Sequence, residues 1–169
     1  MLGEHIDFEL INDCAQALPE AQFLFVGPVE EGVSLPLGPN IEYIGAVDQS
    51  ALPEQLRRMD LCTLPYAMTQ RNHYANPTKV REYLAAGRAV VATRQPGLID
   101  IEGELIVADS TEEYIEALQQ RIRDLPARDS QARRSLETTI AMPMQNETWL
   151  ARATRLSQLL KQRPWIETK

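Results

Sequence analysis

The stretch NPTKVREYLAAGRAVVAT, residues Asn76 to Thr93, joins a predicted helix to a predicted strand. Asn76 is a favourable N-cap, and Pro77 suits the first helical position, where its absent N–H costs no intrahelical hydrogen bond. Gly87 predicts the end of the helix, and the apolar run from Ala89 to Thr93 predicts a buried strand. The stretch is therefore a helix-to-strand unit of the kind from which α/β domains are built.

Lys79 lies in the first turn of this predicted helix, where the positive end of the helix dipole disfavours a cation. The first-turn amides of Thr78, Lys79 and Val80 have no intrahelical acceptor. Free amides beside an ammonium group make a suitable site for phosphate oxygens. We therefore expect an anion to bind at this helix start, held by Thr78, Lys79 and Val80.

Charge is unevenly distributed along the chain. The 169 residues carry a formal net charge of -7, which argues against nucleic acid as a partner because nucleic-acid-binding proteins usually have a basic surface. A local basic region on an acidic protein suits a small polyanionic ligand, and a patch of solvated arginines is the alternative. Between Ala67 and Ile99 a single acid, Glu82, accompanies five basic residues, namely Arg71, Lys79, Arg81, Arg88 and Arg94.

The order of apolar segments predicts an α/β fold. Helical patterns at Asp7 to Leu18, at Ser50 to Met59 with Ser50 as cap, and at Thr111 to Leu125 alternate with strands. This alternation predicts a Rossmann-like, doubly wound parallel sheet with helices on both faces, followed by a C-terminal helical extension over about residues 128–165. The predicted strands are Gln22 to Gly27, Ile41 to Ala46, Leu61 to Tyr66, Ala89 to Thr93 and Glu104 to Ala108.

Three details of this pattern bear on the fold and the site. The near-continuous apolar character of Gln22 to Gly27 suggests burial on both faces of the sheet. In the last helix before the extension, the core-facing set is Tyr114, Ile115, Leu118, Ile122 and Leu125, with caps supplied by Asp109 to Thr111. Ala67 to Ala75 is expected to be a polar loop after a strand's carboxyl end, where open α/β sheets bind ligands.

Several chemistries have no motif in this sequence. There is no GxSxG elbow, Walker A loop, HExxH helix or Cys/His cluster with metal spacing, so no metal or cofactor is expected. Cys14 and Cys62 fall on apolar faces and are expected to be reduced core residues. No apolar run approaches the roughly 20 residues that span a bilayer, and the N-terminus shows no signal-peptide pattern.

Segments along almost the whole chain match one known family. The strongest are LCTLPY and PTKVREYLAAGRAVVAT, supported by QFLFVGP, IEYIGAV, ALPEQLRRMD and a helix with Trp149, Leu156, Leu159 and Leu160. They resemble the nucleotide-sugar-binding C-terminal domain of GT-B glycosyltransferases, particularly the family 4 group (glycosyl transferases group 1). The resemblance implies a single donor-binding domain over residues 1–169. Because only Met1 to Gly3 precede the loop to the first helix, we expect the first strand and an N-terminal acceptor domain to lie outside this chain.

The resemblance implies roles for Glu82 and Lys79. In the family, the glutamate of the E-Y-L-A-x-G segment, here Glu82, holds the ribose hydroxyls, and a carboxylate can accept hydrogen bonds from both hydroxyls of a vicinal diol. Lys79 corresponds to the lysine that neutralises the donor diphosphate and stabilises the leaving nucleoside diphosphate. The alternatives are a surface lysine and a helix glutamate paired with Lys79 or Arg81.

Other positions are weaker candidates for substrate contacts. Arg94 directly follows a strand's carboxyl end. The resemblance places the nucleobase against the backbone of Gly45 and Ala46, and these residues do not distinguish among cytosine, guanine, adenine and uracil. Tyr74 occupies the position where the family often has a second, sugar-contacting glutamate. Its neighbours Arg71, Asn72 and His73, with Tyr74 itself, are substitute sugar contacts, although a lone loop histidine is more often merely exposed.

The predicted function is that of a glycosyltransferase donor-binding domain, hexosyltransferase-like, inactive without the other half of a two-domain enzyme. Its partners would be a nucleotide sugar and the acceptor domain, with no nucleic acid and a cytoplasmic location. Envelope polysaccharide biosynthesis and peripheral membrane association of the full enzyme follow from the family alone, and the apolar final helix allows self-association. The alternatives are a non-catalytic Rossmann-like nucleotide-binding module and part of a nucleotide-sugar epimerase.

Overall fold

The computed structural model describes residues 1–73, 75–98, 101 and 105–161. Strands and helices alternate along the described chain, as predicted. The elements are α1 (Phe8–Ala17), β1 (Phe23–Val26), β2 (Ile41–Gly45), η1 (Gln49–Ala51), α2 (Leu52–Arg58), β3 (Cys62–Leu64), α3 (Gln70–His73), α4 (Thr78–Ala85), β4 (Val90–Thr93), η2 (Pro96–Leu98), β5 (Leu105–Ala108), α5 (Thr111–Asp124), α6 (Gln131–Ala141), η3 (Met142–Asn146) and α7 (Trp149–Lys161), where η denotes a 3-10 helix.

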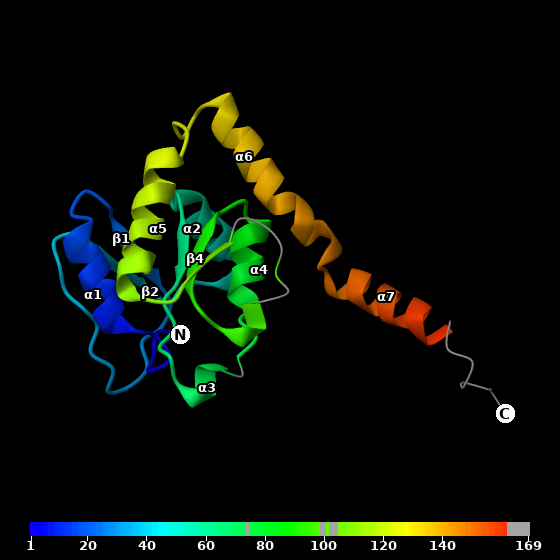
Figure 1. Ribbon diagram of the computed structural model, residues 1–169, viewed down its shortest axis with the longest axis horizontal. Coiled ribbons are helices and arrows are strands. Elements are labelled where there is room, and N and C mark those ends of the chain that lie inside the picture. Colours follow the sequence, from blue (N-terminus) through cyan, green and yellow to red (C-terminus); the bar gives the residue numbers. More distant parts are fainter. Residues whose placement is uncertain (74, 99–100, 102–104, 162–169) are drawn as a thin grey trace.

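The strands pair in parallel, and helices cover both sides of them (Figure 1). Within the described residues they form two sheets, one of order β1-β2 and one of order β3-β4-β5. In the larger sheet Cys62 lies opposite Val90, and Val90 lies opposite Leu105. The predicted α/β fold with a parallel sheet and helices on both faces is confirmed.

The core lies on the two faces of β4, whose four residues are all buried. Val91 packs in a cluster with Cys14 of α1 and Tyr114 of α5. Side chains alternate between the faces of a strand, so Val90 and Ala92 point the other way, into a cluster with residues of α2, α4 and α6. β4 is thus the central buried strand of the described sheet, as its uninterrupted apolar sequence predicted.

The expectation that Gln22 to Gly27 would be buried on both faces is wrong. All four residues of β1, Phe23–Val26, are only partly buried. In the described structure β1 pairs along one edge with β2, and residues of β1 line a cavity that also reaches β3. An apolar strand with an uncovered edge keeps part of its side-chain surface accessible.

Two local predictions need correction, and a third is confirmed. Ser50 does not cap a helix, because the 3-10 turn η1 begins at Gln49 and α2 begins at Leu52 without a side-chain cap. Ile122, predicted to face the core, is 42% exposed, and its side chain lines the cavity that residues of β1 and β3 also line. The capping prediction for α5 is confirmed, because the Ser110 hydroxyl accepts a hydrogen bond from the Glu113 amide at 3.2 Å.

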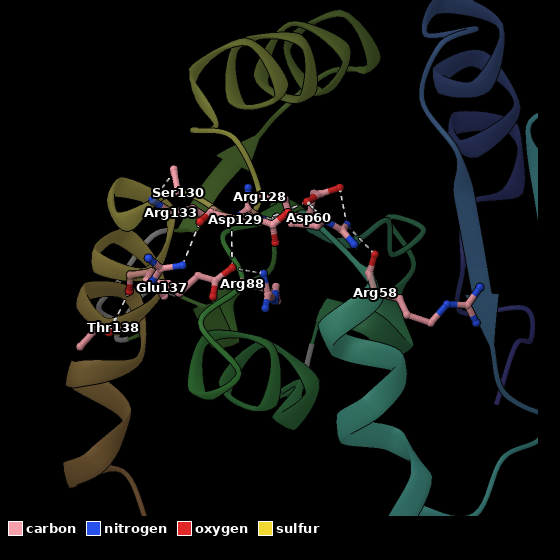
Figure 2. A network of polar contacts seen from close by, with 10 residues as sticks. Arg58, Asp60, Arg88, Arg128, Asp129, Ser130, Arg133, Glu137 and Thr138 are labelled. Atoms are coloured by element: carbon pink, nitrogen blue, oxygen red, sulfur yellow. Dashed lines mark hydrogen bonds and ion pairs between the residues drawn. The ribbon is translucent and has the colours of Figure 1, made fainter.

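The predicted helical extension consists of α6, η3 and α7, and α7 projects away from the sheets (Figure 1). A polar network holds α6 to the domain (Figure 2). In it the buried Arg133 guanidinium donates to the backbone carbonyl of Asp60 at 2.9 Å and to Glu137 at 2.9 Å. Along α7 the large apolar side chains are exposed; they are Trp149, Leu150, Leu156, Leu159 and Leu160.

Candidate functional site

The helix start singled out in the sequence is present, but one residue later than predicted. α4 begins at Thr78, and its N-cap is Pro77, in an extended conformation with φ -70° and ψ 105°. Asn76 is therefore not the N-cap. Its side-chain oxygen instead accepts a hydrogen bond from Arg81 at 2.8 Å. The first turn consists of Thr78, Lys79 and Val80, whose amides are the ones that an α-helix leaves without intrahelical acceptors.

The end of α4 is fixed by Gly87, as predicted. The Gly87 amide donates to the Leu84 carbonyl at 2.9 Å and the Arg88 amide to the Tyr83 carbonyl at 3.0 Å, the two bonds of a Schellman motif. Gly87 has a φ of +73°, and a Cβ there would lie 2.8 Å from the Glu137 carbonyl oxygen. Both the conformation and the close approach of α6 therefore require glycine.

Val80 anchors the first turn, since its side chain is fully buried while Thr78 and Lys79 are exposed. A second close approach positions the segment before the helix. A Cβ on Gly97 would lie 2.3 Å from the Ala75 carbonyl oxygen, so η2 packs directly against the backbone that leads into α4. The helix start is thus held from the core and from the neighbouring loop.

Most of the basic region is neutralised by acids from other parts of the chain. Arg88 pairs with Glu137 of α6 at 2.5 Å, and Arg81 lies 3.6 Å from Glu147. Arg94 forms a bidentate ion pair with Asp109, in which Nη2 of Arg94 lies 2.7 Å from Oδ2 of Asp109. The Asp109 hydrogen bond raises the pKa of Arg94, and the same bond lowers the pKa of Asp109.

Lys79 and Glu82 differ from these arginines. Neither makes an ion pair or side-chain hydrogen bond with any residue that the structure describes. The alternative in which Glu82 pairs with Lys79 or Arg81 is therefore not observed. Three residues apart on α4, the two side chains lie on the same side of the helix. A cation and an anion are thus available to a ligand within one helical turn.

Lys79 and Glu82 both line a cavity of about 760 Å³. His5 and Tyr66 line it as well, and their rings meet edge to face with centroids 5.2 Å apart. Burial raises the pKa of the Tyr66 hydroxyl, which keeps it protonated and able to donate a hydrogen bond. The cavity therefore combines a cation, a carboxylate, a phenol and an imidazole.

His5 and Tyr66 were not among the candidates drawn from the sequence. His5 lies in the N-terminal segment, whose backbone meets β3's carboxyl end through the bond from the Ala67 amide to the His5 carbonyl at 3.0 Å. Tyr66 lies at the end of the LCTLPY strand. The sequence could have predicted Tyr66, because ligands bind beyond the carboxyl ends of parallel strands and Tyr66 lies at such an end.

The expected loop from Ala67 to Ala75 contains a short helix, α3. Asn72 of α3 is buried, and its side-chain amide donates to the carbonyls of His5 and Ala67, each at 2.8 Å. These two bonds fold a polar segment into a helical turn over the N-terminal segment. Asn72 is thus committed to backbone contacts. His73 is exposed, and Tyr74 lies outside the described residues.

Of the candidates that the structure describes, only Lys79 and Glu82 line this cavity. Gly45 ends β2 with a φ of +81°, and nothing lies within 4 Å of the position where its Cβ would be. Gly45, Ala46 and Arg94 are not among the described residues that line the cavity. Tyr43 of β2 packs within the domain, because its ring stacks on Phe25 with centroids 4.9 Å apart.

The described part of the chain has neither a cluster of metal-ligating side chains nor a helix that could span a membrane. No group of three or more His, Cys, Asp or Glu side chains in that part of the chain has the geometry to hold a metal ion. No described helix has both the length and the apolar character to cross a membrane.

Comparisons with known proteins agree with the fold. The domain matches the structure of AviGT4, a glycosyltransferase involved in avilamycin A biosynthesis, with a TM-score of 0.58 and 19% identity over 96% of this chain and 51% of that one. The fold is thus the Rossmann-like fold of GT-B glycosyltransferases. The family model for glycosyl transferases group 1 matches residues 7–124, and the chain belongs to this family.

A curated relative is TuaH of Bacillus subtilis (strain 168), whose name places it among the glycosyltransferases of teichuronic acid biosynthesis. It is 32% identical over 99 residues, which are 54% of this chain and 24% of TuaH. The chain therefore spans about half of one relative and about a quarter of the other.

Proposed function

We propose that the chain binds the nucleoside diphosphate part of a nucleotide sugar at the start of α4. The observation that carries the proposal is the contrast between Lys79 and Glu82, which make no ion pair with described residues, and Arg81, Arg88 and Arg94, which do. Side chains left available at a shared cavity are the ones that a ligand can engage. Membership of the glycosyl transferases group 1 family supports a sugar donor as that ligand.

Each group has a chemically suited task. The ammonium of Lys79 and the first-turn amides of Thr78, Lys79 and Val80 bind the diphosphate oxygens. Glu82, one turn further on, accepts hydrogen bonds from the two ribose hydroxyls. Gly45 and Ala46 remain our proposal for backbone contacts to the base, and His73, Tyr74 and Arg94 for contacts elsewhere on the donor.

In the transfer reaction the bond between the anomeric carbon and the diphosphate oxygen breaks, and negative charge grows on the leaving diphosphate. Lys79 and the helix start stabilise that charge. The acceptor would be bound by the rest of a two-domain enzyme, so this chain alone binds donor without turnover. A role in polysaccharide biosynthesis and a cytoplasmic location stay predictions.

Isothermal titration of the chain with UDP, GDP, ADP and CDP tests the proposal. We expect one of them to bind, and Lys79→Glu to weaken binding at least about 10-fold through loss of a charge-assisted contact. Lys161→Glu on α7 is the matched control, because it makes the same charge change on an exposed helix away from the cavity. Equal affinities in the two variants, or no binding by folded protein to any of the four, would refute the proposed site.

The same pair of variants addresses the alternative of a nucleotide-binding module without donor chemistry. Such a module, binding through another surface, keeps its nucleotide affinity when Lys79 is reversed in charge. Adding the intact sugar nucleotide of the preferred base then separates a donor site from a plain nucleotide site, because the sugar adds contacts only in the former.

A further inference from the structure

A second groove, of about 620 Å³, lies along β5 and α5. It shares no described residue with the cavity that Lys79 and Glu82 line. The strand contributes Ile106, Val107 and Ala108 to its lining, and α5 supplies the other described lining residues. β5 is the last strand in the order β3-β4-β5, so one of its edges has no strand partner within the described residues. The groove therefore combines a strand edge with one side of a helix.

The peptide groups of Leu105 and Val107 point to this outer edge. The Arg94 amide, directly after β4, donates to the Ala108 carbonyl at 3.1 Å, so the peptide groups of Ala108 point toward β4. Peptide groups alternate in direction along a parallel strand, which turns those of Leu105 and Val107 the other way. β5 has the sequence LIVA, without the charges or prolines by which edge strands avoid pairing. Such an edge is a template for one more strand.

A second copy of the chain can supply that strand across a two-fold axis. Two identical edges that meet across such an axis run antiparallel. With the axis at Ile106, Leu105 lies opposite Val107 of the second copy, and the two residues exchange both of their N–H···O bonds. Ile106 then lies opposite Ile106 of the second copy as a non-hydrogen-bonded pair, in which the side chains are closest. This register pairs the outward peptide groups of both Leu105 and Val107.

The same axis brings the two copies of α5 to packing distance. α5 covers β4 and β5, because Tyr114 packs with Val91 and Ile106 and donates to the Val91 carbonyl at 3.0 Å. A helix centred above this pair of strands lies half a strand spacing inside β5, while the axis lies half a spacing outside it. The helix is then about 4.8 Å from the axis. The two helices lie about 10 Å apart, within the interaxial distance of packed helices.

The position of the axis along α5 follows from the lengths of the two elements. Ile106 precedes Asp109 by about 10 Å of extended strand. The same distance along a helix that starts at Thr111 reaches about Leu118. Positions equally far from Leu118 on either side therefore meet across the axis.

The charges on α5 are arranged for this meeting. Glu113 faces Arg123 of the second copy, and Glu116 faces Gln120. These four side chains are exposed, and all of them line the groove. Ala117, which also lines the groove, is small enough to let the helices approach near the axis. A surface with acids at one end and a base at the other is complementary to an antiparallel copy of itself.

We propose that the chain forms a two-fold symmetric dimer through β5 and α5. The sheet of each copy continues into the other, in the order β3-β4-β5-β5-β4-β3. The register of the strands and the charges of the helices place the axis at the same level, although they are independent features. The surface is distinct from α7, whose apolar face allowed self-association on sequence grounds, and it does not depend on donor binding.

Sedimentation equilibrium of the full chain, from about 1 µM to 1 mM, tests the proposal and should show a monomer–dimer equilibrium. Glu113→Arg and Arg123→Glu each turn the attraction into repulsion at both symmetric positions, so each should raise the dimer Kd at least about 10-fold. An equimolar mixture of these two variants should dimerise again, because opposite charges then meet. Glu112→Arg, in the same helical turn but outside the groove, is the matched control and should dimerise like the native chain.

Amide hydrogen exchange locates the strand pairing. At a protein concentration of about 100 times the dimer Kd, about 7% of the chains remain monomeric, so exchange at Leu105 and Val107 should slow by about 10-fold. Ile106, whose peptide groups point toward β4, is the internal reference and should be unchanged by protein concentration.

A native chain that stays monomeric at about 1 mM would overturn the proposal. So would a dimer that withstands both charge reversals, or one that Leu156→Lys on α7 dissociates while Glu113→Arg does not. Titration with UDP and GDP keeps the two proposals separate, because Glu113→Arg should leave nucleotide affinity unchanged.

Discussion

The Arg88 guanidinium lies 2.5 Å from the Glu137 carboxylate and ties the residue that follows the end of α4 to the middle of α6 (Figure 2). The same oxygen accepts from Arg133 at 2.9 Å. Arg88 is 7% and Arg133 2% exposed, so Glu137 compensates the buried Arg88 cation and shares the buried Arg133 cation with Asp60, whose Oδ1 lies 3.1 Å from Nη2 of Arg133. This arrangement fixes α6, and with it the end of α4 opposite the proposed donor site.

Glu137→Ala should therefore destabilise the domain strongly. Removing one partner of a buried ion pair leaves uncompensated charge and costs about 3–5 kcal/mol. Glu54→Ala breaks the exposed pair with Arg57 and should cost about 0–1 kcal/mol. Urea unfolding of both variants measures the difference, and equal losses would contradict a structural role for the network.

The stability of the network should also depend on pH. Burial raises the pKa of Glu137, but hydrogen bonds from Arg133 and Arg88 outweigh it, so the pKa is lowered below its ordinary value of 4.5. A lowered folded-state pKa contributes stability that is present above the unfolded value and is lost as pH falls through the folded one. Unfolding free energies should thus fall below about pH 4.5 in the native chain, and fall less steeply in Glu137→Gln.

Gly87→Ala should be more damaging than the same change at Gly32. Both residues have positive φ, +73° and +82°, so both variants incur the left-handed strain of about 1–2 kcal/mol. Nothing lies within 4 Å of a Cβ at Gly32, whereas one at Gly87 would lie 2.8 Å from the Glu137 carbonyl oxygen. Thermal unfolding should show a lower Tm for Gly87→Ala, and a matching Tm would mean that α6 can shift without cost.

Substitutions of Lys79 and Glu82 should have different effects on the binding of a nucleoside diphosphate and of inorganic pyrophosphate, which lacks the ribose. Glu82→Gln should weaken UDP or GDP binding by about 10-fold or more, because a charge-assisted pair of hydrogen bonds is lost, and leave inorganic pyrophosphate unaffected. Lys79→Ala should weaken both ligands. Glu9→Gln, on the exposed side of α1, is the control for the carboxylate change. Loss of pyrophosphate binding in Glu82→Gln would contradict its assignment to the ribose.

Cys14 and Cys62 should be unreactive in the folded chain. Both are buried, and burial raises each thiol pKa to about 12, so little thiolate exists near pH 8. Their reaction with a thiol reagent such as DTNB should be slow in buffer and rapid in urea. Fast modification of the folded protein would contradict this prediction, because it would show that the packing around Cys14 or Cys62 opens readily.

The sequence determined the features that depend on neighbouring residues. Alternation of helix and strand patterns gave the α/β class, Gly87 marked the end of α4, and the unbroken apolar run of β4 predicted its burial. Each of these follows from backbone conformation or from side-chain period within a few residues. Lys79 and Glu82 were likewise found from their places on one helix.

The tertiary structure decided which charges are available. The sequence could not show that Arg81, Arg88 and Arg94 are ion-paired, because their partners Glu147, Glu137 and Asp109 come from later parts of the chain. The tertiary structure also brought His5 and Tyr66 to the cavity that Lys79 and Glu82 line, since a cavity depends on where distant segments of the chain lie. Pairing between distant segments is set by packing of the whole chain, and no local pattern encodes it.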